Sequence, residues 1–504
     1  MREEGRGVIA NKQWVRAFFV SALLVGCGHH DPQQEASVDV QAVFSVPSSN
    51  VNCIQIVATG AKRAATQTFA VAGGQSTATL FMGGISAGNV LFTGSGFNEQ
   101  CGMIVAASVP TWLGDNVNAT VSIGGPPTTV SMPFRPNGRA LVGGNFVDDQ
   151  YTSSTLAGVA GTAGATDGTG SAARLEGPNG NAFDGGDTLY FADRNITTAG
   201  ANVGMTIRKV SVSTGLVTTL GGSATAVGTA DNAIGTSATF VRLFGVALSA
   251  DNSTLYILDR CALRKMSTAA PNAVSTVLGA RTADSTNWVC GGGNPGVLLD
   301  LAVRATSIYL VDGGNSVISK IPLTGAPTVT VVAGISGNAG FNDGTLTTAR
   351  FSPVGIVFPF STDDVFFVLD NGNTAPDGFS GGFWGTVRRV APVSNSVFTV
   401  AGAPQTGNLI RDGVGANALF VQPRRAVSDG SSLFIGDSTA VRRMDLSAFP
   451  ATVVTIAGGN TAGSTDGVGT AALVNAPFGV SRNAASGALY LSDQGNFTIR
   501  VLTP

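Results

Sequence analysis

The segment Leu189-Tyr190-Phe191-Ala192-Asp193 decides the fold, because its pattern returns near the end of the chain as Leu489-Tyr490-Leu491-Ser492-Asp493. Between these two copies, four more short apolar runs end in Asp, which gives strand ends at Asp193, Asp259, Asp312, Asp370, Asp437 and Asp493. Successive copies are 66, 53, 58, 67 and 56 residues apart. Self-similarity at such a period indicates a repeat architecture, in which each unit buries its apolar face against its neighbours.

Two further elements accompany every apolar run. Before it comes a Thr-Leu-Ala-Gly-like element, seen at 155–158, 219–222, 276–279, 331–334, 399–402 and 455–458. After it comes a strand that carries basic residues, seen at 207–210, 263–266, 318–321, 387–390, 441–444 and 499–502. Apolar and β-branched runs of this length, bounded by Gly, Pro and Asn, are typical of short β-strands.

This pattern resembles NHL-repeat β-propellers over residues 151–504. The blade of that family places a Tyr-Val-Ala-Asp strand before an Asn-His-Arg-Ile-Arg-Lys strand. Here Asn496-Phe497-Thr498 and Asn315-Ser316-Val317 keep the Asn of the naming tripeptide and lack the His. The resemblance implies an all-β fold, a six-bladed propeller of four-stranded blades. The first Thr-Leu-Ala-Gly-like element has no blade before it, so 154–158 is expected to pair beside 498–502 and close the ring.

The repeated charged residues have simpler and more specialised interpretations. The Asp-Gly pairs at 167–168, 343–344, 412–413 and 466–467 are expected to cap turns, with calcium binding as the alternative. The Asp residues at the strand ends are expected to support blade structure. The Arg/Lys pairs of the basic strands are expected to form solvated or hydrogen-bonded outward faces.

The N-terminus has the pattern of an export signal. Basic residues precede the apolar run 17–26, which is about half as long as a bilayer core requires. Leu24-Val25-Gly26-Cys27 resembles a bacterial lipobox, which implies a signal peptide over 1–26, acylation of Cys27 and attachment to a lipid membrane. An ordinary secretory signal with a chance cysteine is the alternative. Residues 27–36 are predicted to be a polar tether, and Gly28 beside the cysteine favours the outer membrane or cell surface.

Residues 37–135 alternate apolar and polar side chains over short runs, which predicts a small immunoglobulin- or fibronectin-like β-sandwich, followed by a linker over 136–150. Four cysteines remain after Cys27, and three pairings are possible. Local disulfides Cys53–Cys101 and Cys261–Cys290 are the simplest choice in an oxidising compartment. Free buried thiols are the alternative.

Composition restricts the function. The formal net charge is −2 and only 12% of residues are charged, so no basic surface for nucleic acid is expected. His occurs only at His29 and His30, so a domain further along has no imidazole for a triad or a zinc site. Glu176 is the only glutamate beyond residue 150. A metal-dependent, lactonase-like propeller hydrolase is therefore an alternative that needs Glu176, Asn179 and strand-end Asp residues to converge; no catalytic residue, metal or cofactor is otherwise predicted.

Two departures from the repeat mark candidate binding residues. At the start of the innermost strand most repeats have an apolar residue, whereas two have Asn179 and Arg424. An Arg there favours an anionic group, unless it pairs with an Asp such as Asp300. The long loop 371–386 carries Phe379, Phe383 and Trp384, a possible contact surface, unless these aromatics fold onto the rim. The resulting hypothesis is a membrane-anchored scaffold that binds a protein or an envelope polysaccharide; a spacer without a ligand is the third interpretation.

Overall fold

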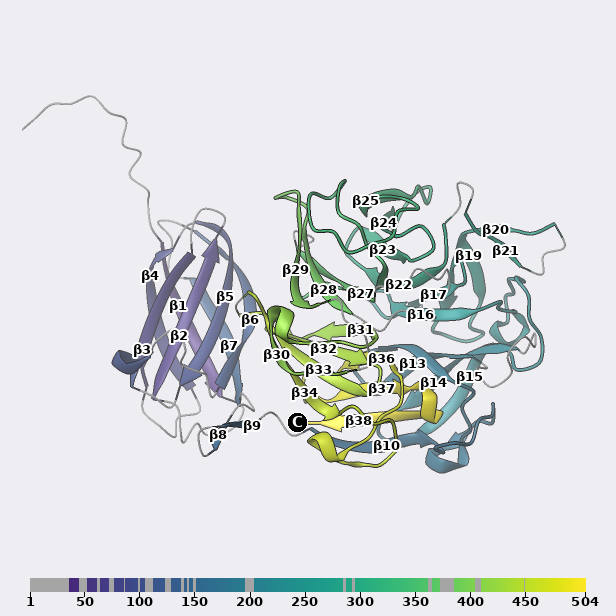
Figure 1. Ribbon diagram of the computed structural model, residues 1–504, viewed down its shortest axis with the longest axis horizontal. Coiled ribbons are helices and arrows are strands. Elements are labelled where there is room, and N and C mark those ends of the chain that lie inside the picture. Colours follow the sequence, from purple (N-terminus) through teal and green to yellow (C-terminus); the bar gives the residue numbers. More distant parts are fainter. Residues whose placement is uncertain are drawn as a thin grey trace, which may run out of the picture.

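The computed structural model describes two all-β regions that lie side by side (Figure 1). The described residues are 36–44, 52–60, 64–71, 77–85, 87–97, 100–104, 112–122, 128–136, 140–142, 145–147, 151–194, 204–283, 287–291, 295–360, 365–371, 385–403, 409–447 and 449–504. Within these ranges, we find no helix with the length and apolar character that a membrane crossing demands.

The N-terminal region is one seven-stranded sheet in the order β3-β2-β5-β6-β7-β1-β4. Its strands are β1 (Ala36–Phe44), β2 (Cys53–Gly60), β3 (Ala64–Ala70), β4 (Thr77–Ile85), β5 (Gly88–Phe97), β6 (Trp112–Val121) and β7 (Thr128–Pro136). All neighbouring pairs are antiparallel except β1 and β7, which are parallel.

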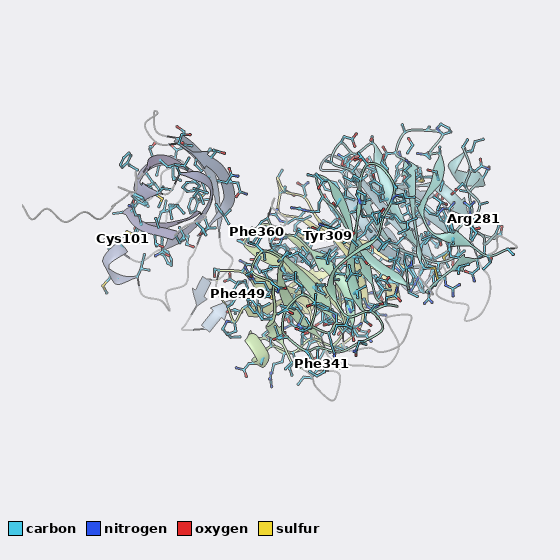
Figure 2. The ribbon with its side chains drawn as sticks, turned by 90° about the horizontal axis from the view of Figure 1, so that it is seen from above. Cys101, Arg281, Tyr309, Phe341, Phe360 and Phe449 are labelled. Carbon is cyan, nitrogen blue, oxygen red and sulfur yellow. A yellow bond between two sulfur atoms is a disulfide. The ribbon has the colours of Figure 1, made fainter. Side chains whose placement is uncertain are left out.

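This sheet curls until its two edge strands meet, so the two packed sheets expected for a sandwich are replaced by a small barrel, seen end-on in Figure 2. The Gln67 Nε2 of β3 donates to the Gly83 carbonyl of β4 at 3.2 Å across this junction. Alternate side chains fill the interior, including Ile54, Ile56 and Phe92. Curling joins the edges that an open sheet of this size would expose.

A disulfide joins Cys53 at the start of β2 to Cys101 in a short 3₁₀ helix (Cys101–Met103). Beyond the barrel, β8 (Ala140–Val142) and β9 (Asn145–Val147) form a two-stranded antiparallel pair. The disulfide ties the segment after β5 back to the sheet, as local cysteine pairing predicts.

The C-terminal region contains, within the described residues, six antiparallel sheets built from four principal strands each. From innermost to outermost strand they are β12 (Pro178–Phe183), β13 (Thr188–Arg194), β14 (Met205–Ser211), β15 (Leu216–Ser223); β16 (Leu243–Leu248), β17 (Thr254–Asp259), β18 (Ala262–Ser267), β19 (Val274–Leu278); β22 (Leu298–Val303), β23 (Ser307–Asp312), β24 (Val317–Pro322), β25 (Thr330–Gly334); β26 (Pro353–Val357), β27 (Phe366–Asp370), β28 (Thr386–Ala391), β29 (Ser396–Gly402); β31 (Pro423–Ser428), β32 (Ser432–Asp437), β33 (Ala440–Asp445), β34 (Thr452–Gly458); and β36 (Pro477–Arg482), β37 (Leu489–Asp493), β38 (Thr498–Thr503), β10 (Thr152–Gly158).

Several sheets carry additional short strands and 3₁₀ helices. Three two-residue strands extend a sheet by one strand: β11 (Gly168–Thr169), β30 (Gly413–Val414) and β35 (Gly467–Val468). A hairpin of β20 (Ala280–Arg281) and β21 (Trp288–Val289) follows β19. Single-turn 3₁₀ helices occur at Gly170–Ala172, Gly235–Ser237, Gly415–Asn417, Gly469–Ala471 and Gln494–Asn496.

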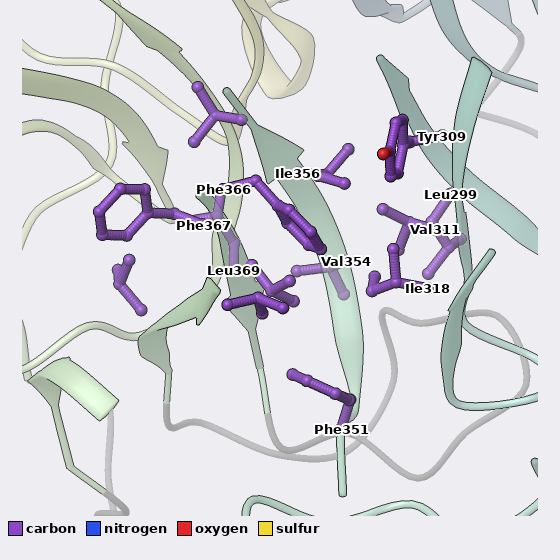
Figure 3. Packing of buried hydrophobic residues seen from close by; sticks show 14 of the residues in the cluster. Leu299, Tyr309, Val311, Ile318, Phe351, Val354, Ile356, Phe366, Phe367 and Leu369 are labelled. Carbon is purple, nitrogen blue, oxygen red and sulfur yellow. The ribbon is translucent and has the colours of Figure 1, made fainter. Parts of the chain in front are cut away.

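The innermost strands contact one another in the cyclic order β12, β16, β22, β26, β31 and β36, and β36 returns to β12. Neighbouring sheets bury their faces against each other; Figure 3 shows Leu299, Val354 and Phe366 among the apolar side chains between two of them. A closed cycle of radial sheets is the propeller arrangement.

The ring closes as the sequence predicts. Strand β10 pairs antiparallel with β38 from Thr152 opposite Thr503 to Gly158 opposite Thr498. The outermost strand of the last sheet therefore comes from the start of the region and the other three from its end. This pairing covers an edge of β38 that would otherwise be exposed.

An arginine-centred cluster recurs in five of the sheets. Each cluster joins one fully or almost fully buried Arg on the third strand to the strand-end Asp and to an upstream Asp, at 2.6–3.3 Å. The sets, Arg first, are Arg208 with Asp193 and Asp167; Arg264 with Asp259 and Asp231; Arg388 with Asp370 and Asp343; Arg442 with Asp437 and Asp412; Arg500 with Asp493 and Asp466.

Two sequence expectations are corrected by these clusters. The Arg of each set is not on a solvated outward face but lies in the sheet-to-sheet interior. Within the described residues, the carboxylate of each Asp-Gly pair does not accept hydrogen bonds from its own turn. Asp167, for example, accepts from Arg208 and from the backbone N–H and hydroxyl of Thr219 on the outer strand. A buried cation needs such paired carboxylates, which explains why all three elements repeat together.

Candidate functional site

The second residue of each innermost strand forms one level of the ring, at the end where these strands begin. In cyclic order these residues are Asn179, Phe244, Leu299, Val354, Arg424 and Phe478. All six are buried. The structure thus brings Asn179 and Arg424, the two candidates from the sequence, to the same level of the ring, with Phe478 on the strand between theirs.

The next level of the ring is filled by Arg425. Its guanidinium reaches from β31 to β22, where it donates to the Asp300 carboxylate and to the Leu299 carbonyl. A Cβ on Gly245 would lie 2.5 Å from Arg425 Nη2, and one on Gly180 would lie 3.0 Å from Arg425 Cζ. Glycine at these positions therefore makes room for the Arg425 side chain.

The partner of Asp300 is thus Arg425 and not Arg424, which corrects the pairing considered for Arg424. Burial raises the pKa of the Asp300 carboxyl, and Arg425 together with the backbone N–H groups of Ile356 and Leu301 opposes this shift. Burial also lowers the pKa of Arg425. Arg425 is therefore engaged in a buried ion pair at the second level of the ring, one residue beyond Arg424.

Guanidinium groups and phenyl rings alternate at the first level. Arg424 Cζ lies 4.6 Å from the ring centroid of Phe478, and Arg424 Nη2 donates to Gln422 Oε1 at 2.7 Å. Arg194, at the end of β13, places its Cζ 5.9 Å from the Phe478 centroid and 5.3 Å from that of Phe244. Stacking on aromatic faces fixes the orientation of the cations and stabilises them.

Asn179 supplies the feature that points to a ligand. It is 0% exposed, and neither its Oδ1 nor its Nδ2 has a hydrogen-bond partner among the residues that the structure describes. A buried amide without partners costs about 1–3 kcal/mol, so each such group needs an explanation. Asn179 lies between Phe478 and Phe244 in the cycle, and Arg194, which stacks on both rings, is on the neighbouring strand β13. Such a set suits an anionic ligand with hydrogen-bonding capacity.

The strand-end Asp that lies beside Glu176 is engaged in other contacts. The strand-end Asp193 accepts from Arg208 and from the backbone N–H groups of Glu176 and Gly177. Burial, followed by the nearby Asp193 charge, raises the pKa of Glu176. Across the described ranges, we find no group of three or more His, Cys, Asp or Glu side chains placed to hold a metal ion.

The second predicted disulfide, Cys261–Cys290, is present, with a Cα–Cα distance of 5.6 Å. It holds the β20–β21 hairpin, whose Trp288 Nε1 donates to Asp259 at 2.9 Å. Cys27, the segments 1–26 and 27–35, and the loop aromatics Phe379, Phe383 and Trp384 lie outside the described residues.

Sequence reasoning missed three contributors to this site. In the sequence, Arg194 is simply the residue that follows the strand-end Asp193. The antiparallel pairing of β12 with β13 places it next to the ring of innermost strands. Phe244 and Phe478 belong to the apolar residues at the start of the innermost strands, and the guanidinium groups stack on their ring faces. Arginine within or directly after a strand of an otherwise apolar repeat is the signal that could have identified the site.

Comparisons with known proteins support the fold. No protein-family model and no curated protein matches the chain. A structural-genomics protein of unknown function from Bacteroides thetaiotaomicron superposes with a TM-score of 0.51 and 17% identity, over 89% of this chain and 90% of that chain. An auxiliary nutrient binding protein from Bacteroides ovatus gives 0.48 and 14%, over 93% and 98%. A streptogramin B lyase gives 0.37 and 12%, over 70% and 98%. At these identities, the first similarity shows a shared fold and nothing further.

Proposed function

We propose that this protein is a lipid-anchored, extracytoplasmic binding scaffold. In this proposal residues 1–26 are removed, and the acylated Cys27 anchors the protein in the outer membrane or at the cell surface. Residues 27–36 then tether a barrel over 37–135. The linker 136–150 then leads to a six-bladed, NHL-like propeller over 151–504 that presents the binding site.

The observation that carries the binding role is the buried, unpartnered amide of Asn179 beside the stacked guanidinium groups. A site that only closed the ring would be filled by apolar side chains, as Leu299 and Val354 do in two of the other sheets. Retaining a buried amide without a partner costs stability, which a ligand that hydrogen-bonds to it would recover.

The chemistry of the site favours a partner that carries a carboxylate or phosphate group. Arg194 and Arg424 provide donors held in fixed orientation by Phe478, and Asn179 offers both a donor and an acceptor. Such a group can belong to a protein or to an acidic envelope polysaccharide. The loop aromatics Phe379, Phe383 and Trp384 are proposed to extend the contact surface around this end of the ring.

Crosslinking in intact cells tests the proposal. The tagged, full-length protein is crosslinked, purified and examined by mass spectrometry for proteins and by composition analysis for saccharides. We expect a reproducible partner whose recovery falls about tenfold with Arg424→Gln, because a charge-assisted contact of about 1.4 kcal/mol is lost.

Two control variants separate the site from the anchor. Arg482→Gln, at the opposite end of an innermost strand, should leave recovery unchanged. Cys27→Ser should release the protein from the membrane while the purified protein keeps its partner. Equal recovery from wild type and Arg424→Gln would contradict the proposed site, and membrane retention of Cys27→Ser would contradict the proposed anchor.

A further inference from the structure

A cavity lies where the barrel faces the propeller region. It has a volume of about 330 Å³ and is lined by β2 and β5 of the barrel and by turns of the propeller region. Figure 2 shows Phe360, one of its lining residues, on the side of the propeller region that faces the barrel. A cavity of this size falls at the lower end of the range for small-molecule sites, which favour domain interfaces.

The strand period explains the wall that the barrel contributes. Along β2, Ile54, Ile56 and Ala58 point into the barrel core, so the alternate residues Gln55, Val57 and Thr59 face outward. Along β5 the same alternation turns Leu91, Thr93 and Ser95 outward. All six outward-facing residues line the cavity. The barrel therefore presents a continuous strip of mixed amide, hydroxyl and aliphatic groups to the cavity.

The polar groups of this strip are not used by the protein. The side chains of Gln55, Thr59, Thr93 and Ser95 make no hydrogen bond to other residues in the described ranges, although Gln55, Thr93 and Ser95 are partly buried. Two domains that simply packed together would pair such groups or replace them by apolar ones, because polar groups without partners weaken an interface. The strip therefore offers amide and hydroxyl groups that a ligand in the cavity could bind.

The opposite wall combines hydroxyl and apolar groups. Ser447 contributes a hydroxyl group, and Phe360 and Leu446 contribute apolar surface. The Ser431 hydroxyl donates to Asp429 at 2.8 Å, so it offers its oxygen as an acceptor. No charged side chain lines the cavity among the described residues. Transfer of an ionic ligand into this space would remove its hydration without a compensating charge, whereas hydroxyl and amide groups can donate to and accept from a neutral ligand.

We infer that this interdomain cavity binds a short, uncharged saccharide. Its volume of about 330 Å³ lies within the range of small-molecule sites and suits a mono- or disaccharide. The ligand hydroxyls bond to Gln55, Thr93 and Ser95, and the apolar faces of the sugar rings lie against Phe360 and Leu446. This site differs in place and charge from the ring end with Arg424, so it does not depend on the function proposed above.

Both walls must contribute, which makes the inference testable by paired variants. The full-length protein is titrated calorimetrically with neutral disaccharides (maltose, cellobiose and lactose) and with a uronate disaccharide as the charged comparison. Thr93→Arg places a charge and bulk on the barrel wall, and Ser447→Arg does so on the propeller wall. Thr129→Arg is the matched control, because Thr129 is exposed on β7, two strands along the sheet from β5, and does not line the cavity.

We expect wild type to bind at least one neutral disaccharide and the uronate at least about tenfold more weakly, a difference of about 1.4 kcal/mol. Each wall variant should weaken binding about tenfold or more, with the control unchanged. Absence of binding by wild type, or binding that survives both wall variants, would overturn the inference. Loss of neutral saccharide binding in Arg424→Gln would also overturn it, since that result would place the ligand at the ring end.

Discussion

The arginine-centred clusters can be tested with Arg388→Met, which removes one buried cation and keeps most of the side-chain volume. Arg388 is fully buried. Its Nη1 donates to Asp370 at 3.0 Å and its Nη2 donates to Asp343 at 2.8 Å. The same two nitrogens donate to the carbonyl groups of Arg350 and Asn342. The variant therefore removes the Arg388 donors from two carboxylates and two carbonyl groups; Asp370 keeps the Ser352 N–H and Asp343 keeps the Thr399 donors.

The magnitude follows from the exposure of the two carboxylates. The Asp370 side chain is 0% exposed and that of Asp343 is 46% exposed. Removing one partner of a buried pair costs about 3–5 kcal/mol, whereas an exposed pair is worth about 1 kcal/mol or less. Burial already raises the pKa of Asp370 to about 7, so this carboxyl can take up a proton when Arg388 is lost. We therefore expect the lower end of the range, about 3 kcal/mol.

Urea denaturation followed by circular dichroism measures this loss. Arg389→Met is the matched control, since Arg389 is only partly buried, stacks on Phe398 and should cost about 1 kcal/mol or less. The sheet of β22 to β25 has no buried Arg at this position. Ser319 takes its place, and the strand-end Asp312 accepts a hydrogen bond from Asn315 Nδ2 at 2.8 Å instead. If Arg388→Met unfolded within about 1 kcal/mol of wild type, the clusters would not be the supports inferred from their burial.

Three other outcomes are expected. Deleting 152–158 exposes the edge of β38 and should lower the melting temperature of the whole C-terminal region; an unchanged melting temperature would show that β10 does not close the ring. Gly245→Ala places a methyl group 2.5 Å from Arg425 Nη2 and should cost about 1–3 kcal/mol in urea denaturation, with wild-type stability as the contrary result. Burial raises the pKa of Asp370 to about 7 and of Asp493 to about 6, above the ordinary 3.8. Because the folded state then holds protons more tightly, the free energy of unfolding should fall as pH rises from about 4 to about 7, and Asp370→Asn should flatten that decline; an identical slope would contradict the assignment.

The repeat could be predicted because its signals are local. Spacing, the Thr-Leu-Ala-Gly-like element and the strand-end Asp identified the strands, and the unmatched first element predicted the pairing of β10 with β38. The barrel was harder to predict, because alternation along single strands is the same for a sandwich and for a curled sheet. The pairings of β1 with both β4 and β7, together with the contact between β3 and β4, decide between them.

Side-chain partners across sheets could not be inferred from spacing. The upstream acid of one cluster, Asp231, is followed by Asn and not by Gly, so the Asp-Gly pattern missed it. Arg424 and Arg425 are adjacent, and a one-residue change of register exchanges the residue that meets Asp300. Burial of arginine is equally hidden, because the same residue type is typical of solvent-exposed strand faces.

The central claim is that the partner binds at the end of the ring that holds Asn179, Arg194 and Arg424. The most direct measurement places a photoreactive amino acid in the full-length protein, in living cells, either at Glu176, which precedes the start of β12, or at Ala485, in the turn after β36. Irradiation should give a discrete adduct from position 176 and none from position 485, and Arg424→Gln should remove it. Adducts from position 485 alone, or from both positions equally, would contradict the claim.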